Sequence, residues 1–218
     1  NIPNSVTTIV NGAFLGCTSL TAINVAADNN RYSSVDGVLF NKSKTVLIHF
    51  PGGKTGTYTI PKSVTSIGSS AFRYSSLTGV TIPNGVSNIG EHAFAESNLT
   101  SINLPNSIIA IRNSTFDGCN DLTSVSIPNS VTSIGEHAFQ ACASLTNIII
   151  PINVASIEAF VFSECANLNT ITFHGFVSAG GLHSDAFDGL GDLRAKYLAG
   201  GPGKYVRPLR SEQWSRQL

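Results

Sequence analysis

With 218 residues, 42% of them apolar, the chain is long enough for one or two domains and apolar enough for a continuous core. No apolar run approaches the roughly 18 residues of a membrane span, which excludes a transmembrane segment from this stretch of sequence. The formal net charge is zero, yet residues 83–190 hold nine acidic residues against Arg112 alone, and the segments on either side are basic. An acidic centre argues against a continuous phosphate track, so we expect no nucleic-acid partner.

The chain starts at Asn1-Ile2-Pro3, which corresponds to the middle of a sequence that recurs further along the chain, and it contains no methionine. Both observations indicate a processed or trimmed fragment. A signal peptide or further repeats on the N-terminal side would not be visible in it.

One phrase recurs along the chain and is most complete from Ile127 to Leu145, where it reads IPNSVTSIGEHAFQACASL. Self-similarity at a fixed period is the sequence signature of a solenoid. We therefore predict a single solenoid over residues 1–198. An early copy opens at Ile2, and later copies start in steps of 22 or 23 residues at Ile60, Ile82, Leu104, Ile127, Ile150 and Phe173.

Each repeat divides into three predicted parts. A short strand with the pattern Leu-Thr-x-Ile-x-Ile comes first, and a proline ends it in most copies because proline donates no ladder hydrogen bond. An extended Val-x-x-Ile segment follows, and a tight turn holding Ala-Phe leads into the next Leu. Stacked repeats align the turn phenylalanines into one internal column, which we predict to be core packing: Phe14, Phe72, Phe94, Phe116, Phe139, Phe162 and Phe187.

The cysteines obey the same register. Cys17, Cys119, Cys142 and Cys165 each follow a column Phe by three residues and precede a column Leu by three. No pair has the close spacing of a zinc site, and in-register side chains rarely offer the dihedral angle of a disulfide. We predict buried free thiols that act as small hydrophobes.

Two segments depart from the repeat. Residues 26–59 form an enlarged repeat, in which two apolar runs flank Asn41–Lys44 as in a β-hairpin. At the other end, Phe173-His174-Gly175 replaces Ile-Pro, and residues 199–218 are basic and rich in glycine. We predict that residues 199–218 cap the solenoid.

The phrase Leu-x-x-Val-x-Ile-Pro-x-x-Val-x-x-Ile-Gly-x-x-Ala-Phe-x-x-Cys-x-x-Leu, which starts at Leu122, resembles the BspA-like (Treponema pallidum-type) leucine-rich repeat. The resemblance implies a leucine-rich-repeat solenoid that is α/β but rich in β-structure, a right-handed superhelix with a parallel sheet on its concave face. It also implies a bacterial protein of the cell surface, secreted or periplasmic, that attaches to host matrix proteins or to other cells. The family ties binding to no residue motif, so no site residue follows from it.

The residues that flank the central position of each strand point away from the core. This row is small, uncharged and able to form hydrogen bonds, and Ile149 is its one large apolar member. We predict that it is a protein-binding concave face, although the same residues could merely suit β-structure and solubility. Its main members are Gly79, Thr81, Ser101, Asn103, Ser124, Ser126, Asn147, Ile149, Thr170 and Thr172.

The row lacks the Trp, Tyr and Arg side chains that anchor many interfaces. Such residues, and lysines, lie instead near the two ends of the chain. They form the alternative contact sites, which are Arg31, Tyr32, Lys42 and Lys44 in the enlarged repeat and Lys204, Tyr205, Arg207, Arg210 and Trp214 in the terminal segment.

We find no catalytic constellation in the sequence. His183, Ser184 and Asp185 are adjacent along the chain, which does not make a catalytic triad. His92 and His137 lie two repeats apart, which is too far to share a metal ion. We therefore expect no enzymatic activity, no metal and no cofactor.

The leading hypothesis is a non-catalytic protein-binding scaffold for adhesion, with host extracellular-matrix or cell-surface proteins as candidate partners. One alternative is a self-assembling structural protein, suggested by the acidic centre, the basic ends and the exposed stack end at Asn1. Another is a small-ligand or glycan binder, which would need a pocket, for example under the hairpin.

Overall fold

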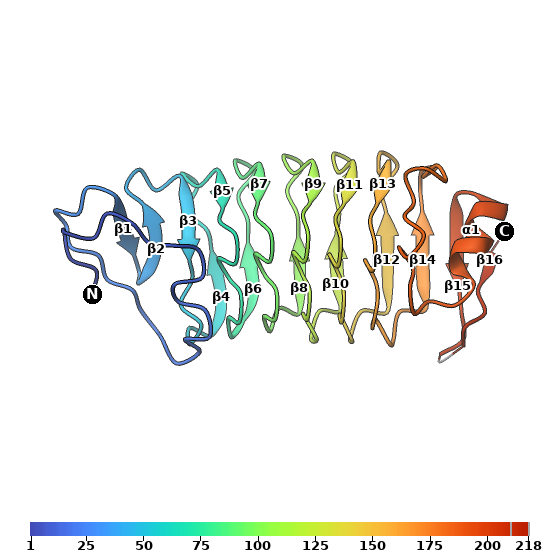
Figure 1. The fold of residues 1–218 in the computed structure, drawn as a ribbon, viewed down its shortest axis with the longest axis horizontal. Coiled ribbons are helices and arrows are strands. Elements are labelled where there is room, and N and C mark those ends of the chain that lie inside the picture. The colour runs from blue at the N-terminus through green and yellow to red at the C-terminus, as the bar shows by residue number, and fades with distance from the viewer. Residues whose placement is uncertain (210, 218) are drawn as a thin grey trace.

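The computed structural model describes residues 1–209 and 211–217, and Figure 1 shows them as an elongated stack of rungs with the two termini at opposite ends. Each regular rung holds one longer and one shorter strand, joined by turns. The longer strands are β4 (Gly56–Thr59), β6 (Leu77–Thr81), β8 (Ser101–Asn103), β10 (Ser124–Ser126), β12 (Asn147–Ile150) and β14 (Thr170–Phe173). The shorter strands are β5 (Ser66–Ile67), β7 (Asn88–Ile89), β9 (Ala110–Ile111), β11 (Ser133–Ile134) and β13 (Ser156–Ile157).

Successive rungs pair in parallel, so sheets run along two sides of the stack. The longer strands follow the order β10-β8-β6-β4 and, after an interruption, β12-β14. The shorter strands form the order β13-β11-β9, and β5 and β7 continue from β3 (Val46–His49). The predicted solenoid is therefore confirmed, with parallel sheets and little helix.

Alternation along each strand decides which side chains enter the core. In β8 and β12, Ile102 and Ile148 are buried, whereas Ser101 and Asn147 beside them are exposed. The strand phrase then ends at a proline, such as Pro105 after β8, which turns the chain away from the sheet.

The phenylalanine column is the centre of the core. From Phe72 to Phe162 the successive rings stack with centroids 5.0–5.7 Å apart and planes within 14° of parallel. The prediction is wrong for Phe14, which is half-buried and packs against the ring of His49 instead. Phe50 takes the place below Phe72, at 5.1 Å, because the enlarged repeat returns its hairpin strand as the preceding rung.

Three of the cysteines are buried free thiols, as predicted, and each forms a hydrogen bond. The thiols of Cys119, Cys142 and Cys165 donate to the carbonyl oxygen of the column Phe one rung earlier, at 3.0–3.2 Å. Burial raises the pKa of Cys119 to about 12, which keeps this donor protonated. The prediction is wrong for Cys17, which is exposed because its turn lies outside the main core. In the 22-residue repeats, the buried Ser75 and Ser97 take the cysteine position.

The turns contain two columns of left-handed residues that sequence reasoning missed. Most positions in these columns are not glycine, although a positive φ disfavours a side chain. Both columns repeat in every regular rung, so the stack imposes the same turn on different residues. The first column is Ser70, His92, Ser114, His137 and Phe160, and the second is Tyr74, Glu96, Gly118, Ala141, Glu164 and Gly189.

The enlarged repeat contains the predicted hairpin and one further strand. β2 (Val38–Asn41) pairs antiparallel with β3, and β1 (Tyr32–Val35) pairs antiparallel with β2 through a turn at Asp36-Gly37, where both residues have positive φ. The buried Asn29 ties the repeat to the N-terminal residues, since its side chain donates to the carbonyls of Pro3 and Val6. The apolar residues at this end of the stack form a second, smaller core cluster that is separate from the main core.

The C-terminal segment covers the last rung. β15 (Gly203–Val206) pairs antiparallel with β14, and β16 (Ser215–Gln217) pairs antiparallel with β15. The helix α1 (Leu193–Gly200) packs nearby, and the boundary that we expect after residue 198 lies inside it. Three aromatic side chains of this segment are buried: Tyr197, Tyr205 and Trp214. The edge of β14 is therefore not free to pair with another chain.

We predict that Phe116→Ala lowers the free energy of unfolding by about 3–5 kcal/mol, because it opens a cavity between two stacked rings. Phe176→Ala is the control, since Phe176 is 64% exposed and its loss should change stability by less than about 0.5 kcal/mol. Urea denaturation followed by circular dichroism measures both variants. Equal effects would contradict the ring column as the centre of the core.

We predict that Ala141→Gly is neutral or stabilises by up to about 1 kcal/mol, because Ala141 has a φ of +54°. Ala143→Gly, two residues further along the same turn and without a positive φ, should lower stability by about 0.5–1 kcal/mol. Thermal unfolding of the two variants decides the point. A loss of the same size in both would show that the left-handed turn carries no strain.

We predict an acid-sensitive step from His49, whose Nε2 is buried without a hydrogen-bond partner in the described residues. Burial lowers the pKa of His49 from 6.5 to about 4. The unfolded chain therefore binds this proton at higher pH than the folded chain, and stability falls as the pH drops from 6.5 towards 4. The loss amounts to about 3 kcal/mol.

Urea denaturation between about pH 7 and pH 4 measures this step. His49→Phe keeps a ring against Phe14 and should flatten that part of the pH dependence. His174→Gln, at an exposed position, should leave the dependence unchanged. An unaltered pH dependence in His49→Phe would exclude His49 as its source.

Candidate protein-binding face

The structure brings all ten predicted residues of the row onto one surface, which we call the strand face. It consists of the outward-pointing residues of β6, β8, β10, β12 and β14. Seven of the ten residues are exposed: Thr81 and the outward residues of β8, β10 and β12. The other three, Gly79, Thr170 and Thr172, are half-buried. Ile149 is 50% exposed and is the one large apolar side chain among them.

The side chains of the strand face are largely free of internal partners. Among the described residues, Ser101, Asn103, Ser124 and Ser126 make no side-chain hydrogen bond, although neighbouring hydroxyls do. At β6, β8 and β10, the threonine just before the strand or near its start donates to a carbonyl of the rung before it, at 3.2 Å for Thr78. Thr100 and Thr123 repeat this bond at 3.1 and 2.9 Å. The hydroxyls and amides of the strand face therefore remain available to a partner.

Two of the alternative contact residues of the enlarged repeat already form hydrogen bonds within the protein. The Tyr32 hydroxyl accepts a hydrogen bond from the backbone N–H of Ile9 at 2.8 Å. Lys42 Nζ donates to the carbonyls of Ala27 and Asn29. Arg31 and Lys44 are exposed. Only these last two keep their charged groups free of the contacts that hold the repeat together.

The alternative contact residues of the C-terminal segment mostly build the cap. Tyr205 and Trp214 are 0% and 2% exposed, and their burial removes them as surface contacts. Arg207 donates to the carbonyl of Leu168 at 2.8 Å and lies over the Trp214 ring. Lys204 is exposed, and Arg210 lies outside the described residues.

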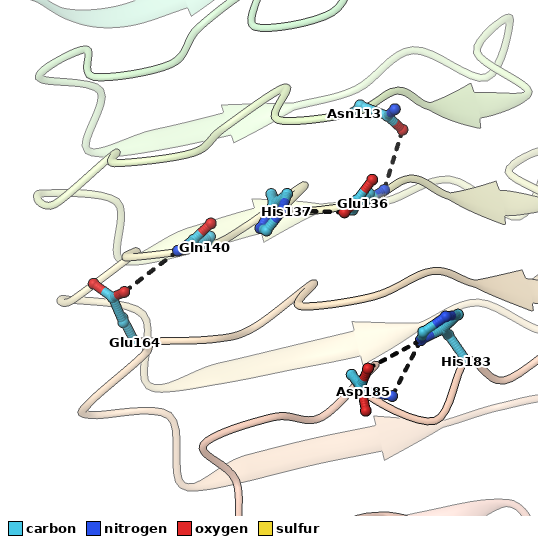
Figure 2. A network of polar contacts seen from close by, with 7 residues as sticks. All are labelled: Asn113, Glu136, His137, Gln140, Glu164, His183 and Asp185. Carbon is cyan, nitrogen blue, oxygen red and sulfur yellow. Dashed lines mark hydrogen bonds and ion pairs between the residues drawn. The ribbon is translucent and has the colours of Figure 1, made fainter.

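Acidic and histidine residues gather on the turns rather than on the strand face. Figure 2 shows part of this group on successive rungs, where Glu136 pairs with His137 at 3.2 Å and Gln140 donates to Glu164 at 3.3 Å. Burial, followed by the nearby charge of Glu96, raises the pKa of Asp117 on the same side. No set of three His, Cys, Asp or Glu side chains in the described residues is arranged to hold a metal ion.

The His183-Ser184-Asp185 run does not form a catalytic arrangement. Nδ1 of His183 accepts the backbone N–H of Asp185 at 3.1 Å and lies 3.9 Å from its carboxylate, as Figure 2 shows. A histidine that activates a serine needs a hydrogen bond to its hydroxyl, and Ser184 makes none within the described part of the chain.

The hollow found next to the hairpin strand β3 is too small for the ligand pocket that a glycan binder would need. The cavity beside Phe14 and His49 has a volume of about 10 Å³, which holds one water molecule at most. A hollow of about 480 Å³ lies over the shorter strands, between Glu91, Arg112 and Glu136. Another, of about 390 Å³, lies on the strand face between β10 and β12. Sequence reasoning missed both hollows.

The repeat, the parallel stack and the column of rings together define a leucine-rich-repeat scaffold. The family described as "BspA type Leucine rich repeat region" matches six copies over residues 1–58 and 49–169. The chain therefore belongs to the BspA-type leucine-rich-repeat family, as the resemblance indicated. No curated protein matches the sequence.

Solved structures of bacterial leucine-rich-repeat proteins share the fold. A leucine-rich cell surface protein from Faecalibacterium prausnitzii is 34% identical, with a TM-score of 0.75 over 83% of this chain and 48% of its own. The pneumococcal vaccine antigen PcpA is 32% identical, with a TM-score of 0.76 over 85% of this chain and 47% of its own. The Treponema pallidum leucine-rich-repeat protein is 26% identical, with a TM-score of 0.55 over 68% and 71%.

This chain thus spans about half the length of the first two of these relatives. Among the described residues, no helix has the length and hydropathy that crossing a bilayer requires.

Proposed function

We propose that this chain is a non-catalytic protein-binding module, displayed on the surface of a bacterium or secreted, and that it binds through the strand face. The observation that carries the proposal is the row of exposed hydroxyl and amide groups, most of which make no side-chain hydrogen bond within the described residues. A partner can approach such small side chains closely and form many hydrogen bonds. Host extracellular-matrix proteins are our first candidates, and the cell-surface and vaccine-antigen descriptions of two relatives support an outward location.

The outward residues of β6, β8, β10, β12 and β14 carry no charge, because the acids of residues 83–190 lie on turns and near the ends of the shorter strands. A cation, Lys204 of β15, stands opposite Thr172 at the edge of the face. The strand face therefore suits a partner surface that is polar but uncharged. Binding to it should depend little on salt, since screening acts on charges.

We predict that Ser101→Glu/Asn147→Glu, on strands either side of β10, abolishes binding to a matrix protein that the wild type retains. Two buried carboxylates without partners would cost at least a hundredfold in Kd. Biolayer interferometry against immobilised fibronectin, fibrinogen and laminin measures this effect. Ser87→Glu/Ala155→Glu is the matched control, because both residues are exposed beside the shorter strands. Loss of binding in the control alone, or no wild-type binding to any matrix protein, would count against the proposal.

Self-association is a second candidate, favoured by the acidic centre and basic ends of the stack. Opposite charges would then meet between staggered copies, and dimers would dissociate as salt rises. Sedimentation at low and high salt tests it, and a monomer at both salt concentrations would exclude it.

A further inference from the structure

We propose that the hollow between β10 and β12 is a docking site for an uncharged, extended segment of a partner protein that inserts one branched or aromatic apolar side chain. This inference rests on the proposed function, because the hollow is part of the strand face. It names the kind of segment that this face would select.

The hollow lies where the sheet of longer strands is interrupted. β8 pairs with β10 and β12 pairs with β14 in register, but no ladder joins β10 to β12 in the described structure. On this side, β10 and β12 therefore lie next to each other without ladder hydrogen bonds. On the opposite side the two rungs stay joined, since β11 pairs with β13 without a break. Between these two rungs, the interruption is consequently confined to the strand face.

Two apolar side chains at the hollow are less buried than those at the same positions in the rung before. Val125 and Ile127 are half-buried, whereas Ile102 and Leu104, which take these positions one rung earlier, are buried. Ile149 closes the hollow from β12 and is half exposed. Apolar surface of this kind is stabilised when a partner covers it.

Exposed apolar residues continue along the rim. Pro151 lines the hollow, and Ile152 next to it is 57% exposed. Phe176 is 64% exposed and follows Gly175, which must be a glycine because a Cβ there would overlap the carbonyl oxygen of Ile152. This close approach of the two turns fixes the rim in place. The rim therefore offers a second apolar contact to a segment that leaves the hollow.

The lining selects against charge. Ser126, Asn129 and His174 supply its polar groups, and no Asp, Glu, Lys or Arg lines it. A charged side chain inserted here would lose its hydration without gaining an ion pair. Hydrogen bonds from Ser126 and Asn129 suit the peptide groups of an extended chain. Because the lining carries no charge, we assign an uncharged segment to the site.

The size fits a side chain rather than a whole ligand. At about 390 Å³ and open to solvent, the hollow lies at the small end of the roughly 300–1,000 Å³ of ligand pockets. One anchoring side chain, with backbone on either side of it, fills such a space.

The test uses a random dodecapeptide library on phage, selected against the folded chain. The enriched peptides are synthesised, and their Kd is measured by fluorescence anisotropy. We expect uncharged peptides that share Leu, Ile, Val or Phe. We also expect Ile149→Asp to raise the Kd at least tenfold, as the loss of one buried apolar contact predicts. Ile109→Asp is the matched control, because Ile109 is 64% exposed just before β9, and it should change the Kd less than twofold.

Three results would overturn the inference. They are equal binding by wild type and Ile149→Asp, a charged residue common to the enriched peptides, and no enrichment above the Ile149→Asp protein. Failure of the hollow is separable from failure of the strand face. A matrix protein that Ile149→Asp still binds and Ser101→Glu/Asn147→Glu does not would overturn the docking site and leave the proposed function standing.

Discussion

Each rung of this protein depends on the rung before it for both its apolar contacts and its backbone hydrogen bonds. The rings of Phe94, Phe116 and Phe139 each stack between the rings of the rungs before and after, so removing one rung would leave two ring faces uncovered. The same dependence holds for polar groups, since the Cys119 thiol satisfies the carbonyl of Phe94 one rung back. A single repeat could not fold alone, because nothing within it supplies these contacts.

This dependence explains why the repeat tolerates some substitutions and not others. Ser97 replaces cysteine at the position of Cys119, because both offer a small side chain with a hydrogen-bond donor. One left-handed turn column accepts both His137 and Phe160, and the other accepts both Ala141 and Glu164, since every rung repeats the same turn. At the positions of the phenylalanine column, by contrast, only a large aromatic ring fills the space.

The architecture was predictable from the sequence, because a strict period of 22 or 23 residues repeats every constraint at each rung. The interior of the array followed from it, including the ring column and the buried thiols. The errors lie where the period is broken. Phe14 and Cys17 precede the enlarged repeat, so their register no longer predicts their neighbours, and Phe50 replaces Phe14. Tyr205 and Trp214 belong to the cap, where no repeat indicates which side chains face inward.

The strand face was predictable for a related reason, since alternation alone decides which residues of a strand point outward. The hollow was not predictable, because it lies where ladder pairing between two rungs stops, and neighbouring repeats of nearly identical sequence give no sign of that place. This difference bears on how such a scaffold recognises a partner. Most side chains that repeat from rung to rung are used to hold the stack together, as the threonines at the strand entrances are. Most outward strand residues make no side-chain hydrogen bond within the described structure, so they can change at little cost to the fold. Ile149 shows that one rung can carry an apolar residue where its neighbours carry serine or threonine. Specificity on this scaffold therefore depends on single rungs that depart from the repeat, while stability depends on the residues that keep to it.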